Sequence, residues 1–148
     1  MLEFHQVHKS YRQGAQRVAA LRGVDLRIQR PGFFAIMGRS GSGKSTLLHL
    51  AAGLDRADAG RIVVNGAELT QMSERQLTGF RRLRVGIVFQ QFNLIPTLTA
   101  AQNIALPGVI AGQPSRWINT RVEELLGRLD MTARAHHRPD ALSGGEQQ

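Results

Sequence analysis

A glycine-rich run in the first third of the chain has the residue types and the spacing that hold phosphate. It fits the pattern G-x-x-x-x-G-K-[ST] at every position and reads Gly38-Arg39-Ser40-Gly41-Ser42-Gly43-Lys44-Ser45-Thr46. Glycines let backbone N–H groups approach phosphate oxygens with no Cβ in the way. Lys44 would reach the β- and γ-phosphates of a nucleoside triphosphate, and the Ser45 hydroxyl would bind Mg²⁺. This run, the glycine loop, therefore predicts a site for a magnesium-bound nucleotide.

The segments on either side of the glycine loop supply the elements that would position it. Residues 33–37 before the loop are all apolar, as in a buried strand, and residues 47–52 after it suit a helix. A helix that begins at the loop adds free N–H groups and a partial positive charge beside the phosphates. The alternative is a glycine-rich turn before a helix, without a ligand. The order strand, loop and helix favours the nucleotide site.

Three further segments carry a resemblance to a known family. The signature segment is Leu142-Ser143-Gly144-Gly145-Glu146-Gln147-Gln148, the glutamine segment is Val88-Phe89-Gln90-Gln91-Phe92-Asn93-Leu94, and the aromatic segment is His8-Lys9-Ser10-Tyr11. Together with the glycine loop, they resemble the characteristic motifs of the ATP-binding cassette (ABC) transporter ATPases. The resemblance covers nearly the whole chain. In residues 86–107 it is nearest to the branch that serves lipoprotein release and macrolide export.

The resemblance implies a role for individual residues outside the glycine loop. Tyr11 would stack on the adenine ring, and Gln90 would bind Mg²⁺ and position water. Ser143, Gly144 and Gly145 would present a hydroxyl and backbone N–H groups to the γ-phosphate held by a second subunit. The implied cofactors are ATP and Mg²⁺, with no other metal.

The resemblance also implies a function and a set of partners. It predicts the ATP-binding subunit of an ABC transporter, which couples ATP binding and hydrolysis to the transport or extraction of a substrate at the membrane. Two such ATPase subunits would enclose ATP between them, and transmembrane permease subunits would dock near the glutamine segment. The predicted location is the cytoplasm, at the inner face of the cell membrane.

Family members carry further residues after the signature segment, namely an apolar strand ending in Asp, a catalytic Glu and a switch His. The given sequence ends at Gln148, before these positions. The expectation is therefore a partial domain without the C-terminal half of its core, in which the apolar faces of residues 33–37 and 85–89 stay partly exposed. A truncated, non-catalytic nucleotide-binding module is the alternative function.

Several site residues have a simpler structural interpretation. Tyr11 would be a strand-end aromatic that covers a small core, and Gln90 would be a polar strand-end residue. Gln91 is the competing assignment for the Mg²⁺-binding role of Gln90. Ser143 and Glu146 fit a capping box that only begins a helix. Because two residues follow Glu146, we expect that helical turn to fray.

Composition excludes several classes of protein. The net charge is +8, but the basic residues are scattered and form no stripe of the kind that binds nucleic acid. The chain has no cysteine, which excludes a disulfide scaffold and argues against the zinc-binding DNA-repair relatives of this family. No long coiled-coil insertion of the chromosome ATPases separates the motifs. Adjacent His136 and His137 point apart and have no suitable partner for a metal site.

Hydrophobic patterning predicts an α/β fold. Short alternating segments indicate an antiparallel sheet, and they span residues 2–4, 18–21, 24–28 and 61–65. Continuous apolar runs at 33–37 and 85–89 predict parallel strands buried on both faces. Helices are predicted at 74–83, 100–106 and 115–129, with Ser73 and Thr99 as N-caps of the first two. The prediction is a P-loop NTPase core with an N-terminal antiparallel β subdomain over 1–95 and a helical subdomain over 96–148.

Overall fold

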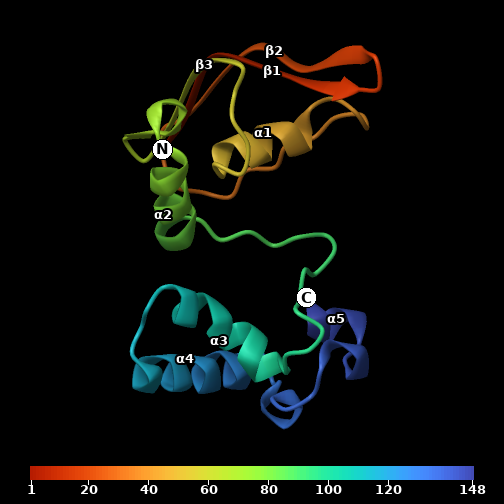
Figure 1. Cartoon of the computed structure of the whole chain (residues 1–148), viewed down its shortest axis with the longest axis vertical. Coiled ribbons are helices and arrows are strands. Elements are labelled where there is room, and N and C mark those ends of the chain that lie inside the picture. The colour runs from red at the N-terminus through yellow and green to blue at the C-terminus, as the bar shows by residue number, and fades with distance from the viewer. The chain divides into compact units, whose positions relative to one another are not determined.

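The computed structural model describes all 148 residues as two compact units, Met1–Val85 and Gly86–Gln148 (Figure 1). The first unit holds the sheet and the glycine loop, and the second is helical. None of the helices is both long and apolar enough to cross a membrane.

One antiparallel sheet forms the scaffold of the first unit. Its strands are β1 (Leu2–Gln13), β2 (Gln16–Ile28), β3 (Ala59–Val64) and β4 (Ala67–Glu68), in the order β2-β1-β3-β4. The predicted antiparallel sheet is confirmed, and the segments at 18–21 and 24–28 join into the single strand β2. The Asn65-Gly66 turn between β3 and β4 has φ values of 48° and 82°, the conformation that a tight hairpin turn demands.

The helices of the first unit cover one side of this sheet. They are α1 (Lys44–Ala51) and α2 (Glu74–Arg84), with a short 3₁₀ turn at Leu69–Gln71 between β4 and α2. Figure 1 shows α1 beneath the β1–β2 hairpin. Ser73 and Gln76 form a complete capping box at α2, which confirms the predicted cap. The buried core consists of Phe4, Val7, Leu21, Leu50, Ile62, Leu69, Leu77 and Phe80.

The second unit is built on two packed helices. Its elements are α3 (Ala100–Ile110), α4 (Ser115–Arg128), 3₁₀ turns at Thr132–Arg134 and Pro139–Ala141, and α5 (Gly144–Gln147). Ile118, Val122 and Leu126 of α4 are buried. The Thr99 cap is confirmed, and α3 continues through Pro107 to Ile110, beyond its predicted end.

The two compact units divide after Val85, whereas the predicted subdomains divide after residue 95. Residues 86–95 group with the second unit. The Asn103 side chain accepts a hydrogen bond from Ile95 N–H at 2.8 Å and donates to the carbonyl oxygens of Ile95 and Leu98. Phe92 lies against Gly144, whose ideal Cβ would be 3.9 Å from the Phe92 Cζ atom.

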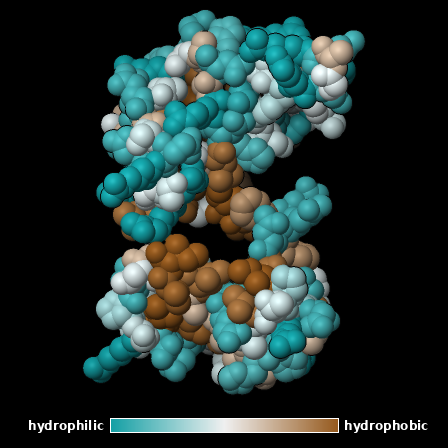
Figure 2. Space-filling model, viewed as in Figure 1, coloured by the Kyte–Doolittle hydropathy of each residue, from teal (hydrophilic) through white to brown (hydrophobic).

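The predicted parallel strands at 33–37 and 85–89 are absent. Both segments lack regular secondary structure, and Phe33, Met37 and Val88 are 96%, 89% and 78% exposed. A strand needs a neighbour for its backbone N–H and C=O groups, and no segment of the chain pairs with either run. The strands did not form, but the exposure of these apolar side chains agrees with the expectation for a partial domain. Figure 2 shows apolar surface on each unit.

A bulge in β1 brings it against Gly60 of β3. The pairing of β1 with both neighbours shifts register around Gln6, which has a φ of 46°. A Cβ on Gly60 would lie 2.3 Å from the Gln6 carbonyl oxygen, and Gly60 itself has a φ of +93°. Glycine is therefore required at position 60 for two reasons, backbone conformation and space.

Gly60→Ala should destabilise the first unit by roughly 3 kcal/mol, since it adds a backbone clash to the cost of positive φ. Gly66→Ala is the matched control, because Gly66 also has positive φ but has no atom within 4 Å of an added Cβ. We expect it to cost only about 1 kcal/mol. Urea-induced unfolding measures both free energies, and equal losses would contradict the proposed clash.

Candidate nucleotide-binding site

The glycine loop is held by a close approach between α1 and β2. Gly43 directly precedes α1 with a φ of 86°, and a Cβ there would lie 2.6 Å from the Ala20 carbonyl oxygen and 2.9 Å from Leu21 Cδ2. Any side chain at position 43 would therefore move the start of the helix. Glycine at this position is required by packing as well as by backbone conformation.

The N-terminus of α1 leaves donors free for an anion. Its first backbone hydrogen bond runs from Leu47 N–H to Gly43 O at 2.9 Å. The N–H groups of Lys44, Ser45 and Thr46 precede this bond and have no backbone acceptor. The helix dipole adds partial positive charge at the same end. This arrangement fits a phosphate group.

The Lys44 side chain folds back over the loop. Its Nζ atom donates to the carbonyl oxygens of Gly38 at 2.9 Å and Arg39 at 2.7 Å. A second loop contact, from Ser42 N–H to Arg39 O at 3.3 Å, closes the turn. The ammonium group is thus held at the mouth of the loop by neutral acceptors, and it can exchange them for phosphate oxygens, which carry full negative charge.

The two hydroxyl residues that end the glycine loop have different surroundings. Ser45 is exposed, whereas Thr46 is 9% exposed and lies among the core-facing residues of α1. A hydroxyl oxygen together with phosphate oxygens is a donor set that suits Mg²⁺. Ser45 therefore fits the predicted magnesium role, and its side chain is accessible for it.

Tyr11 is anchored through its hydroxyl group. Tyr11 Oη donates to Asp55 Oδ2 at 2.8 Å, and Lys9 Nζ donates to Asp55 Oδ1 at 2.7 Å. Lys9 Nζ also lies over the Tyr11 ring, 5.1 Å from its centroid. Tyr11 is 39% exposed, so part of the residue is open to solvent.

The ionisation of this cluster reflects its contacts. Burial raises the pKa of Tyr11, a side-chain hydrogen bond with Thr46 lowers it, and the hydrogen bond to Asp55 raises it, with a net pKa above the ordinary value. Burial raises the pKa of Asp55, but hydrogen bonds from Lys9 and Tyr11 prevail and hold that pKa below its ordinary value. Asp55 is therefore ionised at neutral pH. The Thr46 contact places Tyr11 beside the end of the glycine loop.

Gln90 lies in the second unit. Its side chain is exposed and makes no hydrogen bond, and it lines an open pocket of about 420 Å³ together with Phe92, Pro139 and Gln147. Ser45 belongs to the first unit. Shared coordination of one Mg²⁺ by Ser45 and Gln90 therefore stays a prediction. Gln91 lines the same pocket, so the choice between the two glutamines also stays open.

The signature segment forms a helical turn, contrary to the predicted fraying. Ser143 caps α5, and its N–H donates to Glu146 Oε2 at 2.7 Å. Arg134 Nε donates to Glu146 Oε1 at 3.0 Å, and Gln147 Nε2 donates to the carbonyl oxygens of Pro139 and Leu142. These contacts from outside the turn stabilise a helix that is too short to be stable alone.

Sequence reasoning missed Lys9, Asp55 and Arg134. Each acts through a partner far along the chain: Lys9 and Asp55 are 46 residues apart, and Arg134 and Glu146 are 12 apart. No spacing rule connects such pairs. The available signals were the charge of Lys9 within the aromatic segment and the position of Asp55 just after the predicted helix at 47–52.

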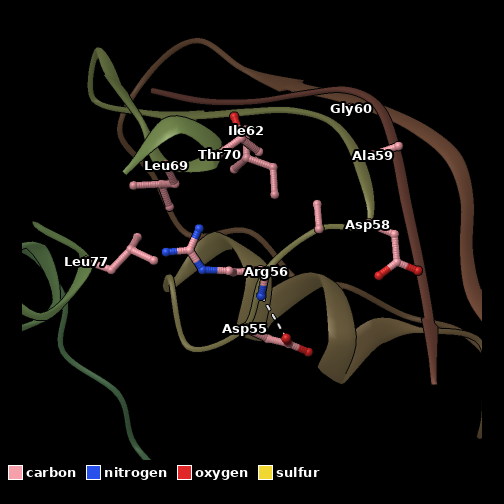
Figure 3. A pocket seen from close by; sticks show the side chains of 10 residues that line it. Asp55, Arg56, Asp58, Ala59, Gly60, Ile62, Leu69, Thr70 and Leu77 are labelled. Atoms are coloured by element: carbon pink, nitrogen blue, oxygen red, sulfur yellow. Dashed lines mark hydrogen bonds between the residues drawn. The ribbon is translucent and has the colours of Figure 1, made fainter. Parts of the chain in front are cut away.

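The first unit also contains a pocket that is separate from the glycine loop. It has a volume of about 220 Å³ and lies between the loop at residues 55–60 and the apolar side chains of Ile62, Leu69 and Leu77. Figure 3 shows the Arg56 side chain directed toward Leu69 and Leu77, whereas the Asp55 carboxylate points away from them. No residue of the glycine loop lines this pocket, so it is not the phosphate site.

A glycine loop at the start of α1, beside an antiparallel sheet and in a chain with a helical unit that ends in the signature segment, defines a P-loop nucleotide-binding protein. The sequence profile of the ABC transporter family matches residues 21–148. The chain therefore belongs to the ABC transporter family.

Two characterised relatives and one solved structure illustrate this membership. The chain is 41% identical over 147 residues to the lipoprotein-releasing system ATP-binding protein LolD of Paramagnetospirillum magneticum, covering 99% of this chain and 65% of that protein. It is 44% identical over 149 residues to the methionine import ATP-binding protein MetN 1 of Pseudomonas putida, covering 100% and 44%. The dimeric ATP-binding cassette MJ0796, bound to ADP and Pi, superposes with a TM-score of 0.90 at 37% identity.

The chain spans only part of the length of each of these proteins. The alignment includes 99% of this chain and 65% of the MJ0796 chain. The chain covers 63% to 66% of three curated relatives and 44% of MetN 1. The fold of an ABC cassette, with its N-terminal antiparallel sheet and its helices, is confirmed over the matched part.

Lys44→Ala should lower the affinity for ATP by about 10- to 100-fold, because it removes the ammonium group that folds back over the loop. Arg82→Ala is the matched control, since it removes one positive charge from an exposed position on α2. Calorimetric titration with MgATP measures both. Unchanged affinity in a folded Lys44→Ala variant would show that the glycine loop is not the site.

Proposed function

We propose that this chain is the ATP-binding subunit of an ABC transporter, which couples the binding and hydrolysis of ATP to transport or extraction of a substrate at the membrane. The observation that carries the proposal is the geometry of the glycine loop. Free backbone N–H groups and the Lys44 ammonium group both lie at the start of α1. Membership of the ABC transporter family supports it.

Under this proposal, each predicted site residue contacts one part of the bound nucleotide or its Mg²⁺. The glycine loop holds the triphosphate, Ser45 and Gln90 bind Mg²⁺, and Tyr11 stacks on the base. Ser143, Gly144 and Gly145 contact the γ-phosphate of ATP bound to a second ABC subunit. The exposed Ser143 hydroxyl and the preformed cap of α5 support this last role, because the N–H groups of a helix start favour an anion.

A second ABC subunit and transmembrane permease subunits are the proposed partners. The dimeric state of MJ0796 supports the first, and the combined ATP-binding and permease protein MacB of Aggregatibacter actinomycetemcomitans, 39% identical over 148 residues, supports the second. Permease binding would hold the chain at the cytoplasmic face of the membrane. The transported substrate is not assigned. A relative named for lipoprotein release and one named for methionine import are each 44% identical to this chain.

A nucleotide-binding module without turnover is the second candidate. The free N–H groups at the start of α1 and the Lys44 ammonium are groups that bind ATP. If the glycine loop binds ATP and the transition state of hydrolysis equally well, it contributes affinity for ATP but does not accelerate hydrolysis.

The test measures ATP binding and phosphate release separately, on the protein with its permease in vesicles. The transporter subunit should bind ATP and release phosphate, and Lys44→Ala should weaken ATP binding and abolish phosphate release. Release that Lys44→Ala leaves unchanged comes from a contaminant and contradicts the proposal. Binding without release above the Lys44→Ala control would identify the non-catalytic module.

A further inference from the structure

We infer that Asp55 and Lys9 are positioning residues that hold the Tyr11 ring with one face open to the nucleobase. This inference rests on the proposed nucleotide site. It adds two residues that contact neither phosphate nor Mg²⁺ and that act through Tyr11.

The Tyr11 ring would be poorly placed without an anchor. It lies in β1, near the hairpin end, and 39% of its surface is exposed. An exposed aromatic side chain samples several rotamers, and each ordered side chain costs entropy when a ligand binds. The hydrogen bond from Tyr11 Oη to Asp55 Oδ2, at 2.8 Å, removes that freedom before the base arrives.

Asp55 is itself fixed by contacts that join it to α1 and β1. Its Oδ1 atom accepts hydrogen bonds from Lys9 Nζ and from the N–H of Arg56, both at 2.7 Å. Lys9 Nζ donates further to the Arg56 carbonyl oxygen at 2.7 Å, and the Lys9 side chain is only 11% exposed. Leu54 N–H bonds to His49 O, which ties the residue before Asp55 to the last turn of α1. The helix that carries the glycine loop therefore also carries the anchor of Tyr11.

The position of Lys9 determines which face of the Tyr11 ring is available to the nucleobase. Its ammonium group lies over the ring, 5.1 Å from the centroid, in the arrangement of a cation–π contact. A base stacks on a single aromatic face. With Lys9 on one face, the opposite face is the one that the base takes.

Asp58 provides a matched comparison in the same loop. Its Oδ2 atom accepts hydrogen bonds from Ser10 N–H at 2.9 Å and from Arg17 Nη2 at 3.0 Å, so it too joins this loop to the β1–β2 hairpin. Asp58 makes no hydrogen bond to Tyr11. A purely structural role for these carboxylates predicts similar effects of Asp55→Asn and Asp58→Asn, whereas positioning of Tyr11 predicts different ones.

The experiment compares the affinity for MgATP with that for magnesium tripolyphosphate, which has no base. Asp55→Asn should lower the affinity for ATP by about 3- to 10-fold, since part of the stacking contribution is lost. It should leave tripolyphosphate affinity unchanged, and Asp58→Asn should leave both unchanged. Tyr11→Phe keeps the ring and removes the anchored hydroxyl, so it should reproduce the effect of Asp55→Asn. The double variant should show no further loss.

Tyr11 is the only tyrosine, so its ionisation can be followed directly by ultraviolet absorbance. Asp55→Asn should lower the pKa of Tyr11, because it removes the negative charge that raises it. Asp58→Asn should leave that pKa unchanged. If Asp55 only stabilised the fold, the two variants would not differ in the pKa of Tyr11.

Equal losses for ATP and tripolyphosphate in Asp55→Asn, or an unchanged ATP affinity in both Asp55→Asn and Tyr11→Phe, would overturn the inference. If Asp55→Asn fails to fold, Tyr11→Phe alone decides, because it retains the Asp55–Lys9 pair. Failure of the unmodified chain to bind either ligand would instead overturn the proposed nucleotide site, and the inference with it.

Discussion

The close approach of Gly43 to the Ala20 carbonyl is the constraint on which the rest of the site depends. It fixes where α1 begins relative to β2, since a Cβ at position 43 would lie 2.6 Å from that oxygen. The free N–H groups of Lys44, Ser45 and Thr46 follow from this starting point. The sheet therefore acts as a rigid support for an anion site, and the glycine loop owes its shape to backbone contact with β2 as well as to its own residues.

A second set of contacts extends from the other end of the same helix. Lys9, Tyr11 and Asp55 connect β1 to the segment after α1. The helix thus carries donors for phosphate at its N-terminus and the support of an aromatic ring beyond its C-terminus. A rigid element that carries both parts keeps their separation constant, which is what preorganised recognition of a nucleotide requires.

The sequence predicted features whose physics is local. The N-caps at Ser73 and Thr99 and the alternation in β1 and β2 depend on near neighbours, and all were confirmed. Predictions failed where the outcome depends on distant partners. The runs at 33–37 and 85–89 were apolar enough for buried strands but found no strand to pair with. The turn of α5 was expected to fray, and Arg134 and Gln147 stabilise it.

Backbone amide chemical shifts during a titration with MgATP test the central claim most directly. We predict that the largest changes fall on the N–H groups of Gly43, Lys44, Ser45 and Thr46, because these donors would gain phosphate acceptors. Changes confined to the pocket between residues 55–60 and Leu77, with the amides at the start of α1 unaffected, would contradict the account.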